Sequence, residues 1–470
     1  MGKIFPEWLT KQMIKGARGF NLDAYVMALE GWRRGLTLTW YLNSTKVTSL
    51  KLIGFNPLGK SFSLYSEESD KTHHFYRSRG DKVSNQAVDI VQNKYLAKEY
   101  FQAANISTPK GIKFNYHSKY DDILNKIDFL EFPLVIKPTT GSLGKEVVTN
   151  ITDFDQLREK VNNAQLSDTY DEFIIEEHFE GEEYRVYVVG NKVVAATKRV
   201  PANVYGDGVS TISELVDKKN KLRKDNPYLA TKPILIDNVV IDYLEKQDLS
   251  LTSIPATNQV VYLKGQSNIS AGGDPVDFTD ELDQEVVSLA VNAVKSIPGL
   301  NHAGVDIIFN GNSAKVIEIN ATADIAMHLF PVKGKPRNVP EKIIDYYFPK
   351  TKGFAKGKSS MYFDYREVNS MLRRQQAQEV KLMDAPKDEL IKTRFIVSGT
   401  VQGVGYRKWI RQRAVSNGIH GYVRNLKNGS VVVIAASDNK ETLSHFKKIC
   451  RKGSPRAKVE QIKELDWNGS

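Results

Sequence analysis

The sequence predicts an α/β protein built from several domains. Its 470 residues are too many for one hydrophobic core, and ordinary domain sizes suggest about three domains. Apolar residues make up 41% of the chain and charged residues 26%, which is the composition of a globular protein rather than a disordered one. Helix-like and strand-like patterns alternate along most of the sequence. We therefore expect consecutive α/β units, each with its own core.

Residues 1–84 predict a small α/β unit at the start of the chain. Apolar residues recur at helical spacing over residues 21–34, and Gly35 ends this helix. Residues 36–41 then follow the pattern of a strand. A helix and a strand in close succession indicate a separate small fold that precedes the larger unit.

Residues 85–350 predict the largest unit, which begins with a helix over about 93–104 and continues in strands and loops. Residues 351–390 differ in composition. They are first rich in Lys and Gly and then polar with a helical pattern, which predicts a linker that contains a helix.

The last unit, residues 391–470, has the most regular pattern. An Asn-Gly pair at 428–429 marks a tight hairpin between two of its strands. The elements in chain order are a strand at 393–399, a helix at 406–417, strands at 420–426 and 430–436, a helix at 440–452 and a strand at 458–465. This β-α-β-β-α-β order predicts a ferredoxin-like fold.

The charge of the chain is concentrated in this last unit. Residues 391–470 hold 16 Lys and Arg against 5 Asp and Glu, whereas residues 1–390 hold 50 of each, so the net charge of +11 belongs to the C-terminal unit. Such a surface attracts anionic substrates or nucleic acid. Because no RNA-binding motif or finger spacing accompanies the charge, we do not expect nucleic acid as a partner.

Other features of the sequence bear on where in the cell the protein resides. No apolar run reaches the about 18–20 residues of a membrane span, and the first residues do not resemble a secretory signal. The single Cys450 excludes an internal disulfide and is predicted to lie on the buried side of a helix. We expect a cytoplasmic protein without a membrane partner. The sequence leaves the oligomeric state open, with a homo-oligomer as one possibility.

The loop before the first helix of the C-terminal unit is suited to binding an anion. Gly403 and Gly405 allow successive backbone N–H groups to point at one centre, at the N-terminus of a helix. Arg407 can grip a phosphate with two N–H groups, and Asn425 follows on the next strand, where it can orient a water molecule. These groups supply the charge stabilisation, so no metal is required.

These residues resemble the acylphosphatase family. The signature consists of GTVQGVGYR at 399–407 and GYVRN at 421–425, and GSPRAKV at 453–459 fits the last loop of the family. The resemblance covers about 80 residues without a gap. It implies that Arg407 binds the phosphate of an acyl phosphate and that Asn425 positions the water that hydrolyses it.

The larger unit contains a second candidate site. Lys137 ends the apolar run at 132–136, so a strand holds its ammonium group at a fixed place. The loop that follows, TTGSLGK at 139–145, contains Gly141 and Gly144 and can close over phosphates with its backbone N–H groups. A glycine loop of this kind is common, so the stronger signal is the pair of strands further along the chain.

Residues 303–309 and 314–320 predict two antiparallel strands. Alternation places Glu318 and Asn320 on one face. Asp306 shares that face only if it pairs with Glu318, and a two-residue turn at 311–312 would give a register one residue away. We therefore predict an odd loop or a β-bulge. Three oxygen donors then converge, which suits magnesium that is also held by ATP phosphates.

This region, about residues 85–350, resembles the ATP-grasp superfamily, and within it the ligase domains of cyanophycin synthetase and of bifunctional glutathione synthetase. The motifs that carry the resemblance are NK at 93–94, VIKP at 135–138, IEEHFEGEEYR at 175–185, KRVPA at 198–202, GDG at 206–208, NISAGG at 268–273 and the two strands with Asp306, Glu318 and Asn320.

The resemblance implies a role for each matching residue. Lys94 and Lys137 contact ATP phosphates or lie beside the adenine. Glu176 lies at the adenine edge, near the backbone of Glu177 and His178, and Glu183 binds the ribose hydroxyls. Arg185 and Arg199 stabilise the transferred phosphoryl group. Asp306, Glu318 and Asn320 hold magnesium, with manganese as the alternative metal, and residues 268–273 form a loop over the acceptor side.

The chain also departs from these relatives. The glycine loop has Ser, Leu and Lys where the relatives usually have a His or Asn and an Arg, and the additional domains of both relatives are missing. Their substrates are therefore not carried over. Residues 209–265, which show no recognisable motif, are expected to determine the carboxylate and the amine.

Together the two sites predict a bifunctional enzyme. One unit is an ATP- and magnesium-dependent carboxylate–amine ligase, acting on amino acids or peptides through an acyl phosphate. The other is an acylphosphatase that hydrolyses acyl phosphate to carboxylate and phosphate. Two alternatives remain: an acylphosphatase whose ATP-grasp unit only senses nucleotide and regulates it, and a modifier associated with nucleic acid.

Overall fold

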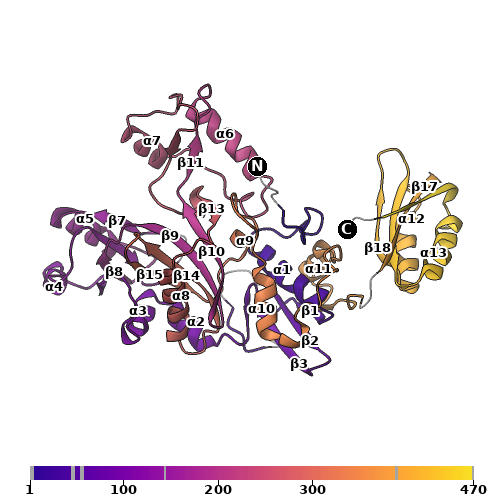
Figure 1. The fold of residues 1–470 in the computed structure, drawn as a ribbon, viewed down its shortest axis with the longest axis horizontal. Helices are drawn as coiled ribbons and strands as arrows, with labels where there is room; N and C mark the ends of the chain where they lie inside the picture. Colours follow the sequence, from indigo (N-terminus) through magenta and orange to yellow (C-terminus); the bar gives the residue numbers. More distant parts are fainter. Residues whose placement is uncertain (1–4, 44–47, 53–57, 142–143, 387–389, 468–470) are drawn as a thin grey trace. The chain divides into compact units, whose positions relative to one another are not determined.

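The computed structural model describes residues 5–43, 48–52, 58–141, 144–386 and 390–467. The chain divides into two compact units (Figure 1). The first unit comprises residues 1–32, 36–352 and 363–383, and the second comprises 33–35, 353–362 and 384–470. The predicted α/β multidomain fold class is confirmed, and neighbouring strands within its sheets pair antiparallel.

The first unit begins with helix α1 (Phe20–Arg33) and a five-stranded antiparallel sheet. The order of its strands is β16-β1-β2-β3-β4, with bounds Glu379–Lys381, Thr37–Tyr41, Ser61–Ser66, Lys71–Tyr76 and Arg79–Gly80. Buried aromatic rings join the helix to the sheet: Tyr25 of α1 and Trp40 of β1 both contact the ring of Tyr365, at 5.6 Å and 5.5 Å between ring centroids.

That tyrosine belongs to the segment in which we expected a linker. Residues 365–373 form the expected helix, α11 (Tyr365–Arg373), whose Tyr365, Val368 and Leu372 are buried. The chain then adds the edge strand β16 to the N-terminal sheet, where Val380 pairs with Trp40. Much of this segment is therefore part of the first unit. A helix face with apolar residues at positions i, i+3 and i+7 needs a surface to cover it, and the sheet supplies one.

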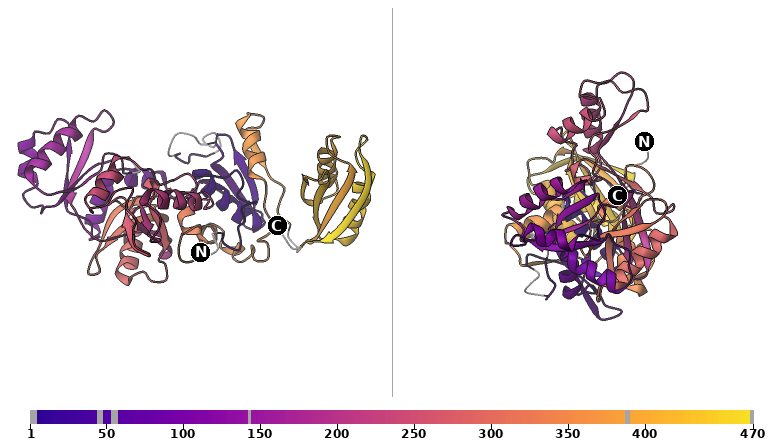
Figure 2. Two further views of the ribbon diagram at one scale, coloured as in Figure 1. Left: turned by 90° about the horizontal axis from the view of Figure 1, so that it is seen from above. Right: turned by 90° about the vertical axis from the view of Figure 1, so that its left-hand side faces the viewer.

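The first unit contains two further large sheets (Figure 2). One has the order β5-β8-β6-β7, with bounds Gly111–Asn115, Glu172–Glu177, Leu134–Pro138 and Val148–Ile151. Its apolar face packs on helices α4 (Tyr120–Lys126) and α5 (Phe154–Gln165).

The other sheet has the order β13-β10-β9-β14-β15, with bounds Asp274–Asp277, Lys192–Val200, Glu182–Val189, His302–Phe309 and Ala314–Asn320. One face of this sheet packs against three helices in a single apolar core. The helices are α2 (Asn85–Gln92), α3 (Lys94–Ala103) and α8 (Gln284–Ser296). The polar residues of the opposite face are therefore free to build a site. Short helices α9 (Ala326–Leu329) and α10 (Val339–Tyr347) follow the sheet.

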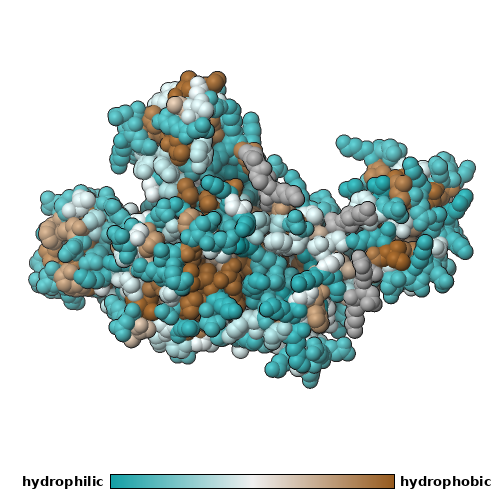
Figure 3. Space-filling model, viewed as in Figure 1, coloured by the Kyte–Doolittle hydropathy of each residue, from teal (hydrophilic) through white to brown (hydrophobic). Residues whose placement is uncertain are grey.

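A small lobe is inserted between β10 and β13. It contains strands β11 (Asn203–Tyr205) and β12 (Val260–Tyr262) and helices α6 (Ile212–Arg223) and α7 (Asn238–Glu245), which enclose a core of their own. Figure 3 shows brown, apolar atoms on the surface of this lobe. The exposed side chains include those of Tyr205, Val209, Leu235, Val239, Ile254 and Tyr262. Most of residues 209–265, where we expected substrate choice, lie in this lobe.

The predicted β-bulge is confirmed. From the turn outward, Phe309 pairs with Ala314 and Ile307 with Val316, which is the register of a two-residue turn. The register then shifts, and Asp306 pairs with Glu318. One extra residue in β15 thus brings Glu318 to the face of Asp306, as the sequence pattern requires.

The second unit has the predicted β-α-β-β-α-β order. Its elements are β17 (Ile391–Thr400), α12 (Tyr406–Ser416), β18 (His420–Asn425), β19 (Val431–Ser437), α13 (Lys440–Lys452) and β20 (Lys458–Asp466). The four strands form one antiparallel sheet in the order β18-β19-β17-β20, and both helices pack on it. Cys450 is buried on α13, as predicted. Among the described residues, we find no helix with the length and apolarity needed to cross a membrane.

Two candidate active sites

The candidate site of the first unit lies on one face of the sheet β13-β10-β9-β14-β15. Four residues stand in a row across neighbouring strands: Thr197 pairs with Arg185, Arg185 with Asp306, and Asp306 with Glu318. Residues directly opposite one another in a sheet share a face, and so do residues two positions apart on one strand. The face that carries this row therefore also carries Arg199, Glu183 and Asn320.

Asp306 is the centre of this face. Its carboxylate binds Arg185 through both oxygens, with Oδ2 at 2.8 Å from Nη2 and Oδ1 against Nε, and Arg199 adds a third contact from Nη2 to Oδ1 at 3.1 Å. Asp306 is buried, and burial raises its pKa, but Arg185 and Arg199 outweigh burial and hold the pKa below its usual value. The carboxylate therefore stays charged between two guanidinium groups.

Arg199 also binds Glu183 on the neighbouring strand through Nη1. Burial alone would lower the pKa of Arg199, but Asp306 and Glu183 together raise it. Burial raises the pKa of Glu183, against the opposing effect of Arg199. The four residues form one network of two arginines and two carboxylates, with Glu183 bound within the network.

Gly304 makes room for this network. It lies two residues before Asp306, and a Cβ atom at this position would lie 2.6 Å from Cβ of Ala323 and 3.0 Å from Cδ of Arg185. A side chain here would push Arg185 away from Asp306. The glycine therefore leaves room for the side chain of Arg185 beside Asp306.

A second buried cluster joins two lysines to one carboxylate. Glu176 on β8 binds Lys137 of β6 through Oε1 and Lys98 of α3 through Oε2, both at 2.5 Å. All three residues are at most 5% exposed. Burial raises the pKa of Glu176, but Lys137 and Lys98 outweigh it, so the pKa lies below the usual value and the carboxylate is charged.

Lys98 was not predicted. It follows Lys94 by four residues, so both lysines lie on the same side of α3, and Lys98 also donates to the carbonyl of Pro109 at 2.7 Å. A lysine in an amphipathic helix ordinarily indicates a solvated face, and no local pattern separates the two cases. The spacing from Lys94 was the one available signal.

Lys94 lies between the two clusters. Its ammonium donates to the carbonyl of Gly141 at 2.8 Å and lies 3.9 Å from Oε2 of Glu318. Burial lowers its pKa, and Lys137 lowers it further while Glu318 opposes both. The backbone N–H of Lys94 also binds Thr139. The start of α3 therefore holds the glycine loop close to the sheet face that carries Asp306 and Glu318.

The glycine loop itself is described at both ends. Gly141 and Gly144 have positive φ angles of 103° and 72°, which glycine adopts without strain. A Cβ on Gly144 would lie 3.6 Å from Nδ2 of Asn268, so the loop lies against the start of residues 268–273. Ser142 and Leu143, which belong to the predicted phosphate loop, lie outside the described residues.

The segment expected at the adenine edge has its N–H groups in use. The N–H of Glu177 binds the carbonyl of Lys110 at 2.9 Å, and that of His178 binds the carbonyl of Pro133 at 2.8 Å. An adenine base at this edge would therefore have to bind atoms other than these two N–H groups. The carboxylate of Glu176 binds Lys98 and Lys137.

The donor set Asp306, Glu318 and Asn320 suits a divalent cation. Oδ2 of Asp306 has one contact, which leaves one of its two lone pairs. Within the described ranges, the carboxylate of Glu318 accepts no hydrogen bond, and its ion-pair contact is Lys94 at 3.9 Å. Two carboxylates and one amide oxygen are the hard donors that magnesium prefers. No group of three or more His, Cys, Asp or Glu residues in the described chain is arranged as a metal site by itself, so such an ion would also need oxygens from its substrate.

The candidate site of the second unit is the loop before α12. Gly403 and Gly405 have φ angles of 76° and 77°, and open space surrounds the position of a Cβ at each. Gly405 caps α12, which places the exposed Arg407 in the first turn of that helix. The backbone N–H groups at the start of α12 and the exposed Arg407 are the kinds of donor that an anion site requires.

Gln402 fixes this loop to the hairpin that carries Asn425. Its Nε2 donates to the carbonyls of Leu426 and Ser430, both at 2.8 Å, so the loop lies beside the end of β18. Ser454 also holds the loop, since its Oγ donates to the carbonyl of Val404 at 3.2 Å. Oδ1 of Asn425 is buried and has no hydrogen-bond partner among the described atoms. A buried amide oxygen without a donor fits a bound water.

Comparison with known families identifies both units. Residues 393–469 match the acylphosphatase family, residues 91–250 match the RimK-like ATP-grasp domain, and residues 195–323 match a further ATP-grasp domain family. The chain joins an ATP-grasp domain to an acylphosphatase domain. The resemblance seen in the sequence is thereby confirmed, and the chain carries domains of two enzyme classes, ligases and hydrolases. The sheet face with Asp306 lies within the ATP-grasp matches, and Arg407 and Asn425 lie within the acylphosphatase match.

Two curated relatives illustrate the similarity of the ATP-grasp part. Cyanophycin synthetase of Synechocystis sp. is 33% identical over 271 residues, which are 56% of this chain and 31% of the relative. The glutathione biosynthesis bifunctional protein GshAB of Clostridium perfringens is 34% identical over 346 residues, which are 66% of this chain and 43% of the relative. The chain therefore spans less than half the length of either relative.

A solved structure is similar to the C-terminal part. Acylphosphatase from Bacillus subtilis is 32% identical and is covered over 89% of its length, which corresponds to 17% of this chain, with a TM-score of 0.16. The acylphosphatase match and the matching signature residues fall in the same unit of the structure.

Proposed function

We propose that the ATP-grasp domain is an ATP-dependent carboxylate–amine ligase and that the acylphosphatase domain hydrolyses acyl phosphates. The observation that carries the first part is the network of Arg185, Asp306 and Arg199 around a buried carboxylate, with Glu318 and Asn320 on the same sheet face. Cations that are fixed before the reaction stabilise charge that moves in the transition state, and this is the main requirement for phosphoryl transfer.

The lysines and arginines divide this work. Lys94 and Lys137, held at the glycine loop and on β6, bind phosphate groups of ATP. Arg185 and Arg199 stabilise the transferred phosphoryl group and the acyl phosphate that forms on the carboxylate substrate. The amine then attacks the acyl carbon, and phosphate leaves. Asp306, Glu318 and Asn320 would hold magnesium, or manganese in its place, which adds positive charge at the phosphates.

The ligase proposal is tested by ADP release. Purified protein is incubated with ATP, magnesium and a panel of amino acids and dipeptides, and Asp306→Asn is run beside the wild type. We expect ADP release that depends on a particular pair of substrates. Removing the carboxylate charge at the centre of the network should lower the rate about 100-fold or more. ADP release that stays at background across the whole panel would contradict the ligase proposal and favour a regulatory, nucleotide-sensing role.

In the acylphosphatase domain, the N–H groups of the glycine loop and Arg407 bind the phosphate, and Asn425 orients the attacking water. The arrangement needs no metal, because the guanidinium and the backbone dipoles neutralise the phosphate charge. Benzoyl phosphate is a suitable probe substrate. Arg407→Ala should abolish its hydrolysis, whereas Lys408→Ala, which removes an exposed cation one residue further along α12, should retain it. Equal activity of the two variants would contradict the assigned role of Arg407.

Because both domains handle an acyl phosphate, we further propose that the acylphosphatase clears acyl phosphate that the ligase forms but does not use. This role is motivated by the shared chemical species. The cytoplasm, where ATP and a reduced Cys450 are maintained, is the compartment that suits the protein.

A further inference from the structure

Residues 268–273, here called the acceptor loop, connect two parts of the candidate site of the first unit. At the end of the loop the chain enters β13, where Pro275 pairs with Arg199. This arginine belongs to the network of two arginines and two carboxylates, called the transfer network from here on. At the start of the loop, Nδ2 of Asn268 lies 3.6 Å from the position of a Cβ on Gly144. The acceptor loop therefore runs from the transfer network to the glycine loop.

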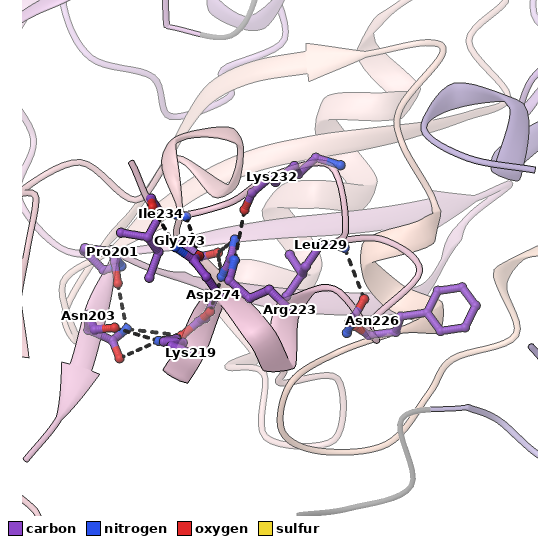
Figure 4. A network of polar contacts seen from close by, with 12 residues as sticks. Pro201, Asn203, Lys219, Arg223, Asn226, Leu229, Lys232, Ile234, Gly273 and Asp274 are labelled. Carbon is purple, nitrogen blue, oxygen red and sulfur yellow. Dashed lines mark hydrogen bonds and ion pairs between the residues drawn. The ribbon is translucent and has the colours of Figure 1, made fainter. Parts of the chain in front are cut away.

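Helix α6 of the inserted lobe binds the end of the acceptor loop. Arg223 in the last turn of α6 is 3% exposed, and its Nη1 and Nη2 both donate to the carbonyl of Gly273 at 3.2 Å. Nη1 also binds Oδ1 of Asp274 at 2.7 Å, and Nε donates to the carbonyl of Lys232 at 2.9 Å. One buried guanidinium thus joins α6, the segment that follows it and the end of the acceptor loop (Figure 4).

Asp274, the first residue of β13, has a second cation partner on the same helix. Lys219, four residues before Arg223, binds Oδ2 of Asp274 at 2.5 Å. The same ammonium donates to the carbonyl of Asn203 at 2.8 Å. Residues four apart lie on one side of a helix, so one side of α6 carries both cations. Lys219, Arg223 and Asp274, here called the clamp, fix the start of β13 relative to α6.

The lobe also contacts the middle of the acceptor loop. Gly272 has a φ angle of 107°, and a Cβ there would lie 2.9 Å from Cγ1 and 3.1 Å from Cα of Ile234. The backbone of Ile234 is held by α6, because Asn220 donates to its carbonyl at 2.9 Å and accepts its N–H at 2.8 Å. The lobe therefore lies directly against the acceptor loop, without room for a further side chain at this glycine.

The clamp contributes more to the place of the loop than to the folding of the lobe. The inserted lobe encloses an apolar core of its own, so its folding does not depend on the clamp alone. The acceptor loop, by contrast, has polar and close contacts with α6 and Ile234 at its end and middle. The position of the loop relative to Arg199 is therefore set from the lobe.

We propose that Arg223 is a positioning residue for the ligase reaction, and that it holds the acceptor loop at the place where the carboxylate substrate receives the phosphoryl group. This role rests on the proposed ligase function. A carboxylate that is phosphorylated there lies between the glycine loop and the transfer network, and the acceptor loop borders that space at both ends. A displacement of about 1 Å at a reacting group can cost about 100-fold in rate, so a loosened loop should slow the reaction.

Two variants disturb the position of the loop in different ways. Arg223→Met removes the four hydrogen bonds of the guanidinium and keeps a long side chain. Gly272→Ala pushes the loop away from Ile234 and leaves Arg223 intact. Lys221→Met, which removes an exposed cation from the same turn of α6, is the matched control. Arg223→Lys keeps a charge beside Asp274 but lacks the planar fork, so it should restore part of the function.

For each protein, kcat, KM for the carboxylate and KM for ATP are measured by ADP release with the best substrate pair of the panel. In Arg223→Met and Gly272→Ala we expect a raised KM for the carboxylate and a fall of about 10- to 100-fold in its kcat/KM. KM for ATP should stay within about twofold of the wild type, because the clamp lies at the end of the acceptor loop that is remote from Gly144. Lys221→Met should match the wild type in all three quantities.

A merely structural role predicts a different result. A less well folded variant contains less active protein, which lowers kcat and leaves both KM values unchanged. That result in both variants would overturn the proposal, and so would an equal rise of KM for ATP. Absence of ADP release from the wild type across the whole panel would instead show that the ligase function is wrong, and the positioning role with it.

Hydrogen exchange gives a readout that does not depend on turnover. In the full chain, peptides that cover residues 266–276 should exchange faster in Arg223→Met than in Lys221→Met, because the end of the loop has lost its contacts with α6. Equal exchange in the two variants would also overturn the proposal.

Discussion

Among single residues, Glu176 is one whose charged state depends on its two lysine partners. It is a buried carboxylate between Lys98 and Lys137, with ion-pair contacts of 2.5 Å to each. Glu176→Gln would leave two buried ammonium groups without a counter-charge. Since breaking a buried ion pair costs about 3–5 kcal/mol, the free energy of unfolding of the first unit should fall by about that amount at neutral pH.

The pH dependence of this effect has a definite sign. The folded pKa of Glu176 lies below its usual value, so the stabilisation is present above the unfolded pKa of about 4.3 and is lost as pH falls through the folded pKa. Scanning calorimetry of the two proteins from pH 7 downward should show their transition temperatures converging in acid. Glu180→Gln, an exposed neighbour, serves as control. A difference that stays constant down to the acid transition would contradict the charged buried pair.

Gly304 is the residue whose replacement tests the transfer network most directly. Gly304→Ala places a methyl group 3.0 Å from Cδ of Arg185 and 2.6 Å from Cβ of Ala323, so one of them must move. Because displacements of about 1 Å at a catalytic group can cost about 100-fold in rate, we expect single-turnover ADP release to slow about 10- to 100-fold. Gly311→Ala, in the open turn after β14, adds backbone strain at a φ of 92°, but nothing surrounds its Cβ position and the site is remote in register, so that rate should stay within about twofold. Equal rates for both variants would contradict the conclusion that Gly304 leaves the space that Arg185 needs.

Residue patterns predicted part of this site and missed part. The shared face of Asp306, Glu318 and Asn320, with the bulge it requires, follows from alternation within one hairpin and was predicted. The binding of Asp306 to Arg185 and Arg199, and the cluster of Lys98 with Glu176, depend on which strands and helices become neighbours. Such contacts join residues far apart in sequence, and no local spacing records them.

At the level of elements, β18 shows how a glycine permits strand pairing. Gly421 has a φ angle of 133°, and a Cβ there would lie 2.0 Å from the carbonyl oxygen of Ile434 on β19. Gly421→Ala adds backbone strain to a collision with the backbone of the neighbouring strand. Together these should cost about 2–6 kcal/mol in the free energy of opening the second unit.

The matched control is Gly429→Ala in the hairpin turn, where φ is also positive but the Cβ position is open. This variant should cost about 1–3 kcal/mol from strain alone. Hydrogen exchange of peptides that cover residues 420–437 measures both costs in the full chain. Similar protection in the two variants would show that the approach of Gly421 to Ile434 is unimportant.

The elements of the second unit were predicted correctly, whereas β16 was not predicted, and the difference lies in how much local pattern each element has. The order of strands and helices in the second unit was predicted because each element has a clear local pattern and the Asn-Gly turn fixes the hairpin. Strand β16, by contrast, is three residues long and includes Glu379 and Lys381, so no apolar alternation marks it. It becomes a strand through pairing with β1, and its place in the N-terminal sheet is visible only in three dimensions.

For the whole molecule, the central question is whether the two domains handle the same acyl phosphate. If the acylphosphatase hydrolyses acyl phosphate formed by the ligase, the wild type consumes more ATP than the amide bonds it makes, and the excess grows when the amine is scarce. Arg407→Ala removes the guanidinium that we propose binds the phosphate, so its ratio of ADP to amide product should fall toward one. The ratio is measured by quantifying both products over a range of amine concentrations.

A mixing experiment then separates transfer within one chain from release into solution. The Arg407→Ala chain supplies an active ligase, and an Asp306→Asn chain supplies an intact acylphosphatase. If the mixture again forms more ADP than amide product, the acyl phosphate is released by one chain and hydrolysed by another. If the excess is absent in the mixture but present in the wild type, the intermediate is hydrolysed only when both sites belong to the same chain. A ratio that is the same in the wild type and in Arg407→Ala would show that the acylphosphatase acts on another substrate. The positive excess of residues 391–470 would then serve to attract an external anion.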